Sequence, residues 1–170
     1  MKGELIKEIV FIESSDEARE LYNQGRFGEL VDNKYHYSLV EALYMLERKK
    51  LEITQKSKEL TYETFLKLCK KIDPNFWIRY CVYRDLRKRG YIVKTALKFG
   101  ADFRVYDRGI KPGEDHAKWI VYPVHESTAL TWYDFAAKNR VAHSTKKRLL
   151  IGIVDEESDV TYYEINWKRP

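Results

Sequence analysis

The segment FRVYDRGIKPGEDHAKW, residues 103–119, holds two titratable side chains ten positions apart, Tyr106 and His116. FRVYD alternates in polarity and KWIVYPV is an apolar run, so both flanks are predicted strands. The Pro-Gly pair between them predicts a turn. Tyr106 then lies near the end of one strand, and His116 lies just before the next. A histidine in such a loop suits proton transfer, because imidazole titrates near pH 6.5.

A third candidate, Lys147, begins an apolar strand in HSTKKRLLIGIVD, 31 residues after His116. Taken singly, each of the three has an ordinary explanation. Tyr106 is one of 13 tyrosines, most of which pack in a core or face solvent. A lone loop histidine is more often structural than catalytic, and Lys147 fits a solvated strand end. Local context alone therefore assigns no role to any of them.

Together, Tyr106, His116 and Lys147 resemble in type and spacing the catalytic triad of the archaeal tRNA-splicing (tRNA-intron) endonucleases. The block LRKRGYIVKTALKFGADFRVYDRG is similar to that family's strand–turn–strand signature. RVAHSTKKRLLIGIVDEESDVTYYEI resembles its second block, which runs through an acidic loop to the last strand. YSLVEALYMLERKKLEI resembles the helix and strand of its amino-terminal domain. The blocks cover most of the chain, most densely from residue 86 to 167.

The resemblance implies a metal-free and cofactor-free RNA cleavage, because RNA carries its own nucleophile, the 2′-hydroxyl. Tyr106 is then the general base and His116 the general acid that protonates the departing 5′-oxygen. Lys147 stabilises the charge on the phosphorane. The expected substrate is precursor tRNA with a bulge–helix–bulge, cut to 2′,3′-cyclic phosphate and 5′-hydroxyl ends.

Two electrostatic conditions accompany these roles. A phenol has an unperturbed pKa of about 10, so nearby cations would have to favour its ionised form. Three candidates are present: Arg104, Arg108 and Lys147. The general acid must start protonated, and the adjacent Glu114 and Asp115 would help to keep it so.

Arg140 is a candidate for substrate binding. By resemblance it aligns with an arginine that joins one from the opposite active site to sandwich a flipped-out bulge base. Stacking of a guanidinium on a base is physically reasonable. The ordinary alternative is an arginine near a helix end that interacts with the helix dipole.

The resemblance also implies a homotetramer, arranged as a dimer of dimers. The acidic turn DEESD, residues 155–159, would dock into a partner subunit, and the strand VTYYEINW, residues 160–167, would pair within each dimer. An intron has two splice sites and this chain has one triad, which favours symmetric subunits. The alternative for the turn is a solvated hairpin tip.

Two other functions stay open. The chain could be a non-catalytic structural or RNA-binding subunit of the same family, although the presence of the whole triad disfavours this. It could also be a metal-dependent nuclease built on Asp102, Asp115 and Lys118. That reading is weak, because two residues separate Asp115 from Lys118 where the usual acid-x-Lys triplet has one.

Composition excludes several classes. The formal net charge of +5 and a pI near 9.0 are compatible with a polyanionic partner. There is no P-loop, GxGxxG, HExxH or GxSxG motif, and the four histidines lack metal-ligand spacing. The two cysteines have no CxxC partner, which predicts reduced thiols and a cytoplasmic location. We expect no membrane segment.

The elements that position these residues follow from periodicity, caps and turns. We expect strands at residues 7–14, 27–38, 51–55, 91–100, 101–107 and 118–124 and a closing pair within 147–167. Helices are expected at 14–25, 38–50, 61–71, 76–90 and 128–144. The predicted class is α/β (α+β): a small mixed N-terminal domain, residues 1–74, followed by a C-terminal nuclease domain, residues 75–170, with a central mixed sheet flanked by helices.

Overall fold

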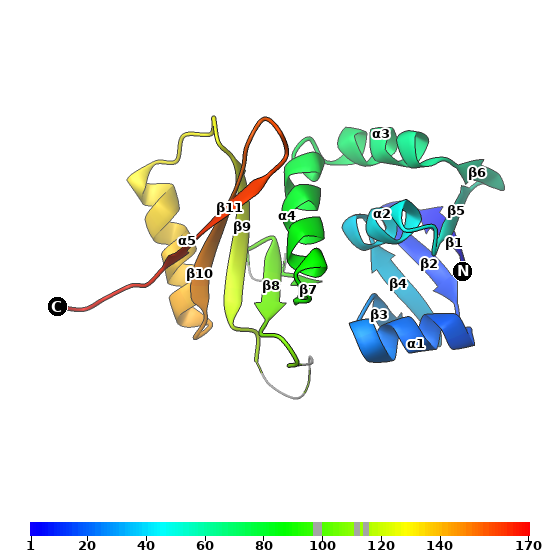
Figure 1. The fold of residues 1–170 in the computed structure, drawn as a ribbon, viewed down its shortest axis with the longest axis horizontal. Helices are drawn as coiled ribbons and strands as arrows, with labels where there is room; N and C mark the ends of the chain where they lie inside the picture. The colour runs from blue at the N-terminus through cyan, green and yellow to red at the C-terminus, as the bar shows by residue number, and fades with distance from the viewer. Residues whose placement is uncertain (97–99, 111–112, 114–115) are drawn as a thin grey trace. The chain divides into compact units, whose positions relative to one another are not determined.

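A computed structural model describes residues 1–96, 100–110, 113 and 116–170. Its backbone contacts divide the chain into two compact units, Met1–Trp77 and Ile78–Pro170. Each unit holds a mixed sheet with helices (Figure 1), which confirms the predicted α/β (α+β) class. The boundary between residues 74 and 75 stays a prediction.

The N-terminal unit is built on one six-stranded sheet, in the order β3-β4-β2-β1-β5-β6. The β1–β5 pair is parallel, and the other neighbouring pairs are antiparallel. Its elements are β1 Lys2–Ile6, β2 Ile9–Glu13, α1 Asp16–Gly25, β3 Glu29–Val31, β4 Lys34–Ser38, α2 Leu39–Glu47, β5 Glu52–Gln55, β6 Lys58–Leu60 and α3 Tyr62–Ile72.

Sequence reasoning missed β1 and β6 and merged β3 with β4. The β3–β4 and β5–β6 hairpins turn through Asp32–Asn33 and Lys56–Ser57, and all four residues have positive φ. Two positive φ angles match the right-handed twist of the strands and are usually supplied by Asn-Gly or Asp-Gly. A Lys-Ser pair carries no such signal, so this turn was not recognisable from the sequence.

Helix α2, predicted at residues 38–50, is buried on almost every side. Its residues from Leu39 to Met45 are all buried, including Glu41. The Glu41 carboxylate is satisfied there: it accepts hydrogen bonds from the Gly28 and Ser38 amides at 3.0 Å and from the Ser38 hydroxyl at 2.8 Å. A buried acid is tolerated when its oxygens are bonded in this way.

The C-terminal unit holds a five-stranded sheet in the order β11-β10-β9-β8-β7. Only the β9–β10 pair is parallel, so the sheet is mixed, as predicted. The elements are α4 Phe76–Lys88, β7 Ile92–Thr95, β8 Phe103–Tyr106, β9 Trp119–His125, α5 Trp132–Ser144, β10 Arg148–Val154 and β11 Val160–Ile165. Among the described residues, no helix could cross a membrane.

Helices α4 and α5 cover opposite faces of this sheet (Figure 1). On the α4 side, the Tyr83 ring packs 5.9 Å from the Phe103 ring. On the α5 side, Ala142 joins a buried cluster with Ile120 and Leu149. The flanking helices of the prediction are thus confirmed, and the two faces give a reference for placing each site residue.

Candidate active site

Topology brings the three predicted site residues to one edge of the C-terminal sheet. Strand β8 is antiparallel to β9, and β9 is parallel to β10. The carboxyl end of β8 therefore lies beside the amino ends of β9 and β10. Tyr106 is the last residue of β8, His116 precedes β9 by three residues, and Lys147 immediately precedes β10. We call this edge the catalytic edge.

The end of α5 fixes the position of Lys147. Lys146 has a left-handed φ of 55°. Its amide donates to His143 O at 3.0 Å, and the Lys147 amide donates to Ala142 O at 2.8 Å. This pair of bonds is the Schellman motif, with a lysine where glycine is usual. The Lys147 ammonium turns back and donates to Thr145 O at 3.0 Å, which keeps the charged group beside the turn that follows α5.

The loop that carries His116 is closed at its base by Asp107 and Lys118, whose charged groups are 2.7 Å apart. The hydrogen bond from Lys118 and a second from the Arg108 amide hold the pKa of Asp107 below its ordinary value. The Lys118 amide donates to Val105 O at 2.9 Å, although Val105 is paired with Trp119. Val105 of β8 is thus opposed by Trp119 and by Lys118 just before β9, an arrangement of the β-bulge type, which is often found beside active sites.

A pocket of about 330 Å³ opens at the catalytic edge, lined by His116, Ile120, Thr145, Lys146 and Lys147. The structure therefore brings His116 and Lys147 together. Tyr106 lies at the same edge but is not among the described residues that line this pocket, and its side chain is 5% exposed. His116 is exposed. Glu114 and Asp115, expected to support its protonated form, lie outside the described residues.

Sequence reasoning did not single out Thr145 or Lys146, although both line the pocket. Their contribution comes from the left-handed turn after α5, which brings the Thr145 carbonyl to the Lys147 ammonium. A glycine in HSTKKR would have marked that turn. With a lysine in its place, the sequence held no clear signal.

Arg140 lies elsewhere on α5 and is exposed. It lines a larger groove of about 700 Å³ between α5 and the residues that follow β11, including His143 and Trp167. The rings of His143 and Trp167 are 4.5 Å apart. Within one chain, Arg140 does not share the pocket of His116 and Lys147.

The residues of the metal-dependent alternative do not assemble in the described part of the chain. The Asp102 carboxylate forms an ion pair of 2.7 Å with Arg79, and Lys118 is bound to Asp107. Asp115 lies outside the described residues. Asp102 and Lys118 thus have structural partners, which weakens that alternative.

A group that the sequence did not indicate lies at the other end of β9. His125, Glu126 and Glu156 place their ligand atoms within 4.8 Å of one another, although Glu156 is 30 residues away along the chain. The Ser127 amide lies 3.3 Å from His125 Nδ1 and can only donate to it. Nδ1 is then the acceptor, and Nε2 carries the proton 3.6 Å from Glu156. A metal-bound histidine normally donates from its second nitrogen, so a neutral His125 whose Nε2–H faces the Glu156 carboxylate explains this group better than a metal site.

Comparison with known proteins assigns the chain to a class of RNA-processing nucleases. Residues 76–162 match the family model described as tRNA intron endonuclease, catalytic C-terminal domain, and residues 1–66 match that of the N-terminal domain. The chain belongs to the tRNA intron endonuclease family.

Curated relatives extend over most of the chain and bear the name tRNA-splicing endonuclease. The protein of Thermococcus onnurineus is 45% identical over 159 residues, 94% of this chain and 91% of the relative. The protein of Nanoarchaeum equitans is 48% identical over 147 residues, covering 83% and 94%. The protein of Methanothermobacter thermautotrophicus is 39% identical over 170 residues, covering 100% and 99%.

Proposed function

We propose that this protein is a tRNA-intron endonuclease that excises introns from precursor tRNA at bulge–helix–bulge splice sites, in the cytoplasm. The observation that carries the proposal is the placement of Tyr106, His116 and Lys147 at one edge of the C-terminal sheet. These three side chains come from three separate segments. Family membership and the names of the relatives support the substrate class.

The chemistry follows from the three groups. Tyr106 Oη takes the proton of the 2′-hydroxyl, and the 2′-oxygen attacks the adjacent phosphorus. His116 gives a proton to the 5′-oxygen as the bond from phosphorus to that oxygen breaks. Lys147 faces the phosphorane, whose negative charge grows in the transition state. The products are a 2′,3′-cyclic phosphate and a 5′-hydroxyl, and the reaction needs neither metal nor cofactor.

Arg140 contributes to choosing the splice site in this proposal. Its guanidinium stacks on a bulge base that has left the helix, which phosphate contacts alone could not distinguish. The exposure of Arg140 and the neighbouring groove between α5 and Trp167 support a contact with a planar group.

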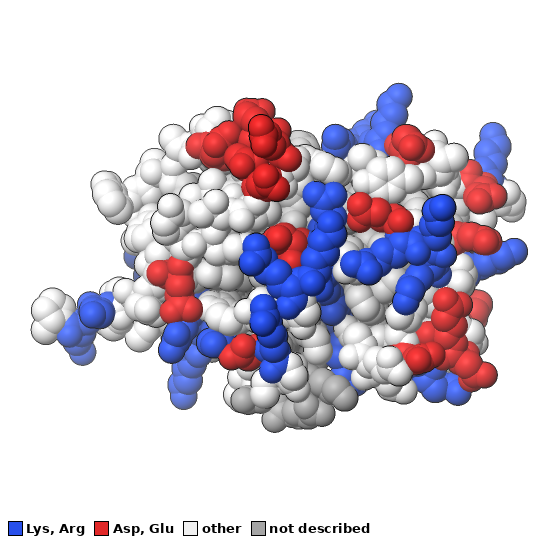
Figure 2. Space-filling model, viewed as in Figure 1, with Lys and Arg blue, Asp and Glu red and all other residues white. Residues whose placement is uncertain are grey.

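Assembly into a homotetramer completes the proposal, with the acidic turn at residues 155–159 as the docking element. Figure 2 shows acidic side chains gathered over the β10–β11 hairpin. The turn is held firmly. The Asp155 carboxylate accepts the amides of Glu157 and Asp159, both at 2.9 Å, and Glu126 accepts the Glu156 amide at 3.0 Å. A rigid acidic projection on a basic protein suits a basic surface of a partner subunit.

Strand β11 supports the pairing of subunits within each dimer. It is the last strand of its sheet, so one of its edges has no neighbouring strand among the described residues. Its Tyr163, 58% exposed, and Trp167 after it, 57% exposed, are large rings left facing solvent. Edge strands with exposed aromatic residues favour pairing with another chain.

One incubation tests the proposal: purified protein alone with an intron-containing precursor tRNA, in excess EDTA. We expect cleavage at both splice sites with 2′,3′-cyclic phosphate ends. Complete loss of activity in chelator, restored by Mg²⁺, would instead support the metal-dependent nuclease. Binding of the precursor without cleavage in either condition would support a non-catalytic subunit that needs a different partner.

A further inference from the structure

Arg104, the second residue of β8, carries a charge that the described part of the chain does not neutralise. Its side chain is half-buried, and its Nε is shielded from solvent. That nitrogen has no hydrogen-bond partner among the described residues, which leave out 97–99, 111–112 and 114–115. Shielding part of a cation without a partner is costly. Such a group in a folded protein calls for an explanation.

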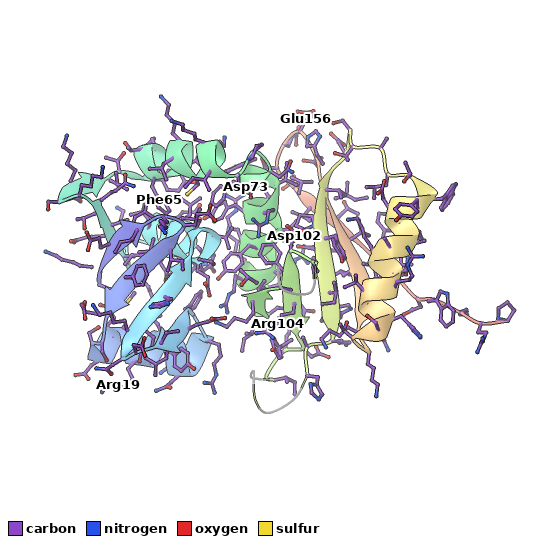
Figure 3. All side chains as sticks on the ribbon, turned by 180° about the vertical axis from the view of Figure 1, so that it is seen from behind. Arg19, Phe65, Asp73, Asp102, Arg104 and Glu156 are labelled. Atoms are coloured by element: carbon purple, nitrogen blue, oxygen red, sulfur yellow. The ribbon has the colours of Figure 1, made fainter. Side chains whose placement is uncertain are left out.

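The side chain of Arg104 lies on the same side of the sheet as the pocket. Side chains alternate along a strand, so Arg104 and Tyr106 share one face and Phe103 takes the other. Phe103 faces α4, where it meets Tyr83. The register pairs Arg104 directly with Ile120, which lines the pocket of His116 and Lys147. Figure 3 shows Arg104 beside β8, far from Glu156 at the other end of the sheet.

A second cation raises the positive charge at this place. Lys94 of β7 is directly opposite Arg104 and is only 8% exposed. Like charges directly opposite each other destabilise a sheet. Lys94 makes an interaction of its own, so Arg104 is the member of the pair that is available to an anion. With Lys146 and Lys147 in the pocket, this face is prepared for a negatively charged group.

We propose that Arg104 binds a non-bridging oxygen of the scissile phosphodiester, a contact that rests on the proposed function. A guanidinium presents several donors in a fixed plane that fits phosphate oxygens. It approaches from β8, while Lys147 approaches from the turn before β10. Charge on these oxygens grows as the phosphorane forms, so the contact strengthens in the transition state. Arg104 is then a catalytic residue beside the triad.

Single-turnover cleavage with saturating enzyme separates this contact from general RNA binding. We expect Arg104→Ala to slow cleavage on the order of 10²-fold, as loss of one charge-stabilising donor does, with little change in the Kd for precursor. Arg104→Lys should recover part of the rate. Arg148→Ala is the matched control, because Arg148 is an exposed cation at the same edge that pairs with Glu164. Equal rate losses in Arg104→Ala and Arg148→Ala would overturn the contact.

Thermal unfolding tests Arg104 even if the wild type cleaves no RNA. In phosphate-free buffer, Arg104→Met should keep or raise Tm, because it removes a shielded cation. Added inorganic phosphate, at constant ionic strength, should raise the Tm of the wild type more than that of Arg104→Met. A large loss of Tm in Arg104→Met, or equal phosphate effects in both proteins, would overturn the proposal. An inactive wild type with the expected Tm pattern would reject the proposed RNA cleavage but retain an anion site at Arg104.

Discussion

The two ends of the C-terminal sheet treat their charged groups in opposite ways. At the acidic end, carboxylates of Asp155 and Glu126 bind the backbone amides of the turn at residues 155–159. Asp155 accepts two amides, and Glu126 binds the Glu156 amide. At the catalytic edge, His116 and Lys147 line an open pocket, and the Arg104 Nε has no partner in the described part of the chain.

Under the proposed function, this difference separates a docking surface from a reactive one. A surface that binds another folded surface gains affinity when it is rigid before binding, because little conformational entropy is then lost. A reactive edge must keep its donors and cations for the substrate, and it gives up stability to do so. The four variants below test this division, from the largest expected effect to the smallest.

Replacing His116 by alanine should have the largest effect. We expect the cleavage step to slow by roughly 10²–10⁴-fold, while the Kd for precursor tRNA changes little, because an acid used in the transition state adds little to ground-state binding. Single-turnover kinetics and a filter-binding titration measure the two quantities.

His125→Ala at the acidic end is the control for this variant, compared at protein concentrations where sedimentation finds the same assembly. It should cleave at nearly the wild-type rate. A near-normal rate in His116→Ala would show that the acid is another group and that the catalytic edge is wrongly assigned.

Reversing the charge of Glu157 and Asp159 to lysine should break the assembly. Both side chains are exposed and leave the Asp155 carboxylate in place to hold the turn. Like-charge contacts cost several kcal/mol at an interface, so tetramers should separate into dimers and cleavage should be lost. Sedimentation velocity measures the assembly, and circular dichroism checks the fold.

The double variant Glu157→Gln with Asp159→Asn removes the charge without reversing it and should show an intermediate effect. An intact, active tetramer in the lysine variant would mean that the turn is a solvated hairpin tip. The contrast between the two ends would then lose its functional meaning.

Replacing Arg140 by alanine should weaken the choice of bulged sites more than it weakens RNA binding in general. A stacked base is worth about 1–3 kcal/mol, and this term acts only where a base can leave the helix. Competition between bulged and plain duplex RNA measures the ratio of the two affinities.

Lys138→Ala on the same helix removes an equal charge. The Lys138 ammonium has a contact within the chain, 4.1 Å from the centre of the Tyr122 ring, so Lys138→Ala is the matched control. If Arg140→Ala and Lys138→Ala give the same ratio of affinities for bulged and plain RNA, Arg140 is an ordinary cation near a helix end.

The smallest expected effect is on stability, at Lys146. Its φ of 55° favours glycine, so Lys146→Gly should raise the free energy of unfolding by up to about 1 kcal/mol. Lys49, with φ 57°, occupies the equivalent position after α2, where the Lys50 amide donates to Met45 O. Lys49→Gly should give the same gain. Denaturant titration measures both, and a gain at Lys49 alone would show that Lys146 has a compensating interaction at the pocket.

Much of the fold was predictable because its signals are local. Helices α3 and α5 begin at Thr61 and Thr131, whose hydroxyls accept the amides of Thr64 and Asp134. Gly90, with φ 88°, follows α4 as expected. Helix α1 ends at Gly25 as predicted, but the residue that takes the left-handed conformation there is Arg26, which is not a glycine.

Two features of the C-terminal sheet, one at each end, escaped prediction because they depend on residues distant in the sequence. That the Arg104 Nε has no hydrogen-bond partner among the described residues could not be anticipated from FRVY, which shows only an alternating strand. The group of His125 and Glu156 is formed by the pairing of β9 with β10, which brings residues 31 positions apart together. The three residues of the proposed triad were selected by resemblance, since nothing local distinguished them.

The parallel β9–β10 pair has a consequence for how the protein folds. Arg148 pairs with Trp119, and the chain between them must pass through the whole of α5 before that pair can form. Contacts between residues so far apart in sequence form slowly, because the entropy of closing the loop is lost before the pairing is gained. Hairpins such as β7–β8 and β10–β11 need no such closure. His116 and Lys147 meet only when the slow pair is complete, so a partly folded chain holds most of its helices and hairpins before it can cut RNA.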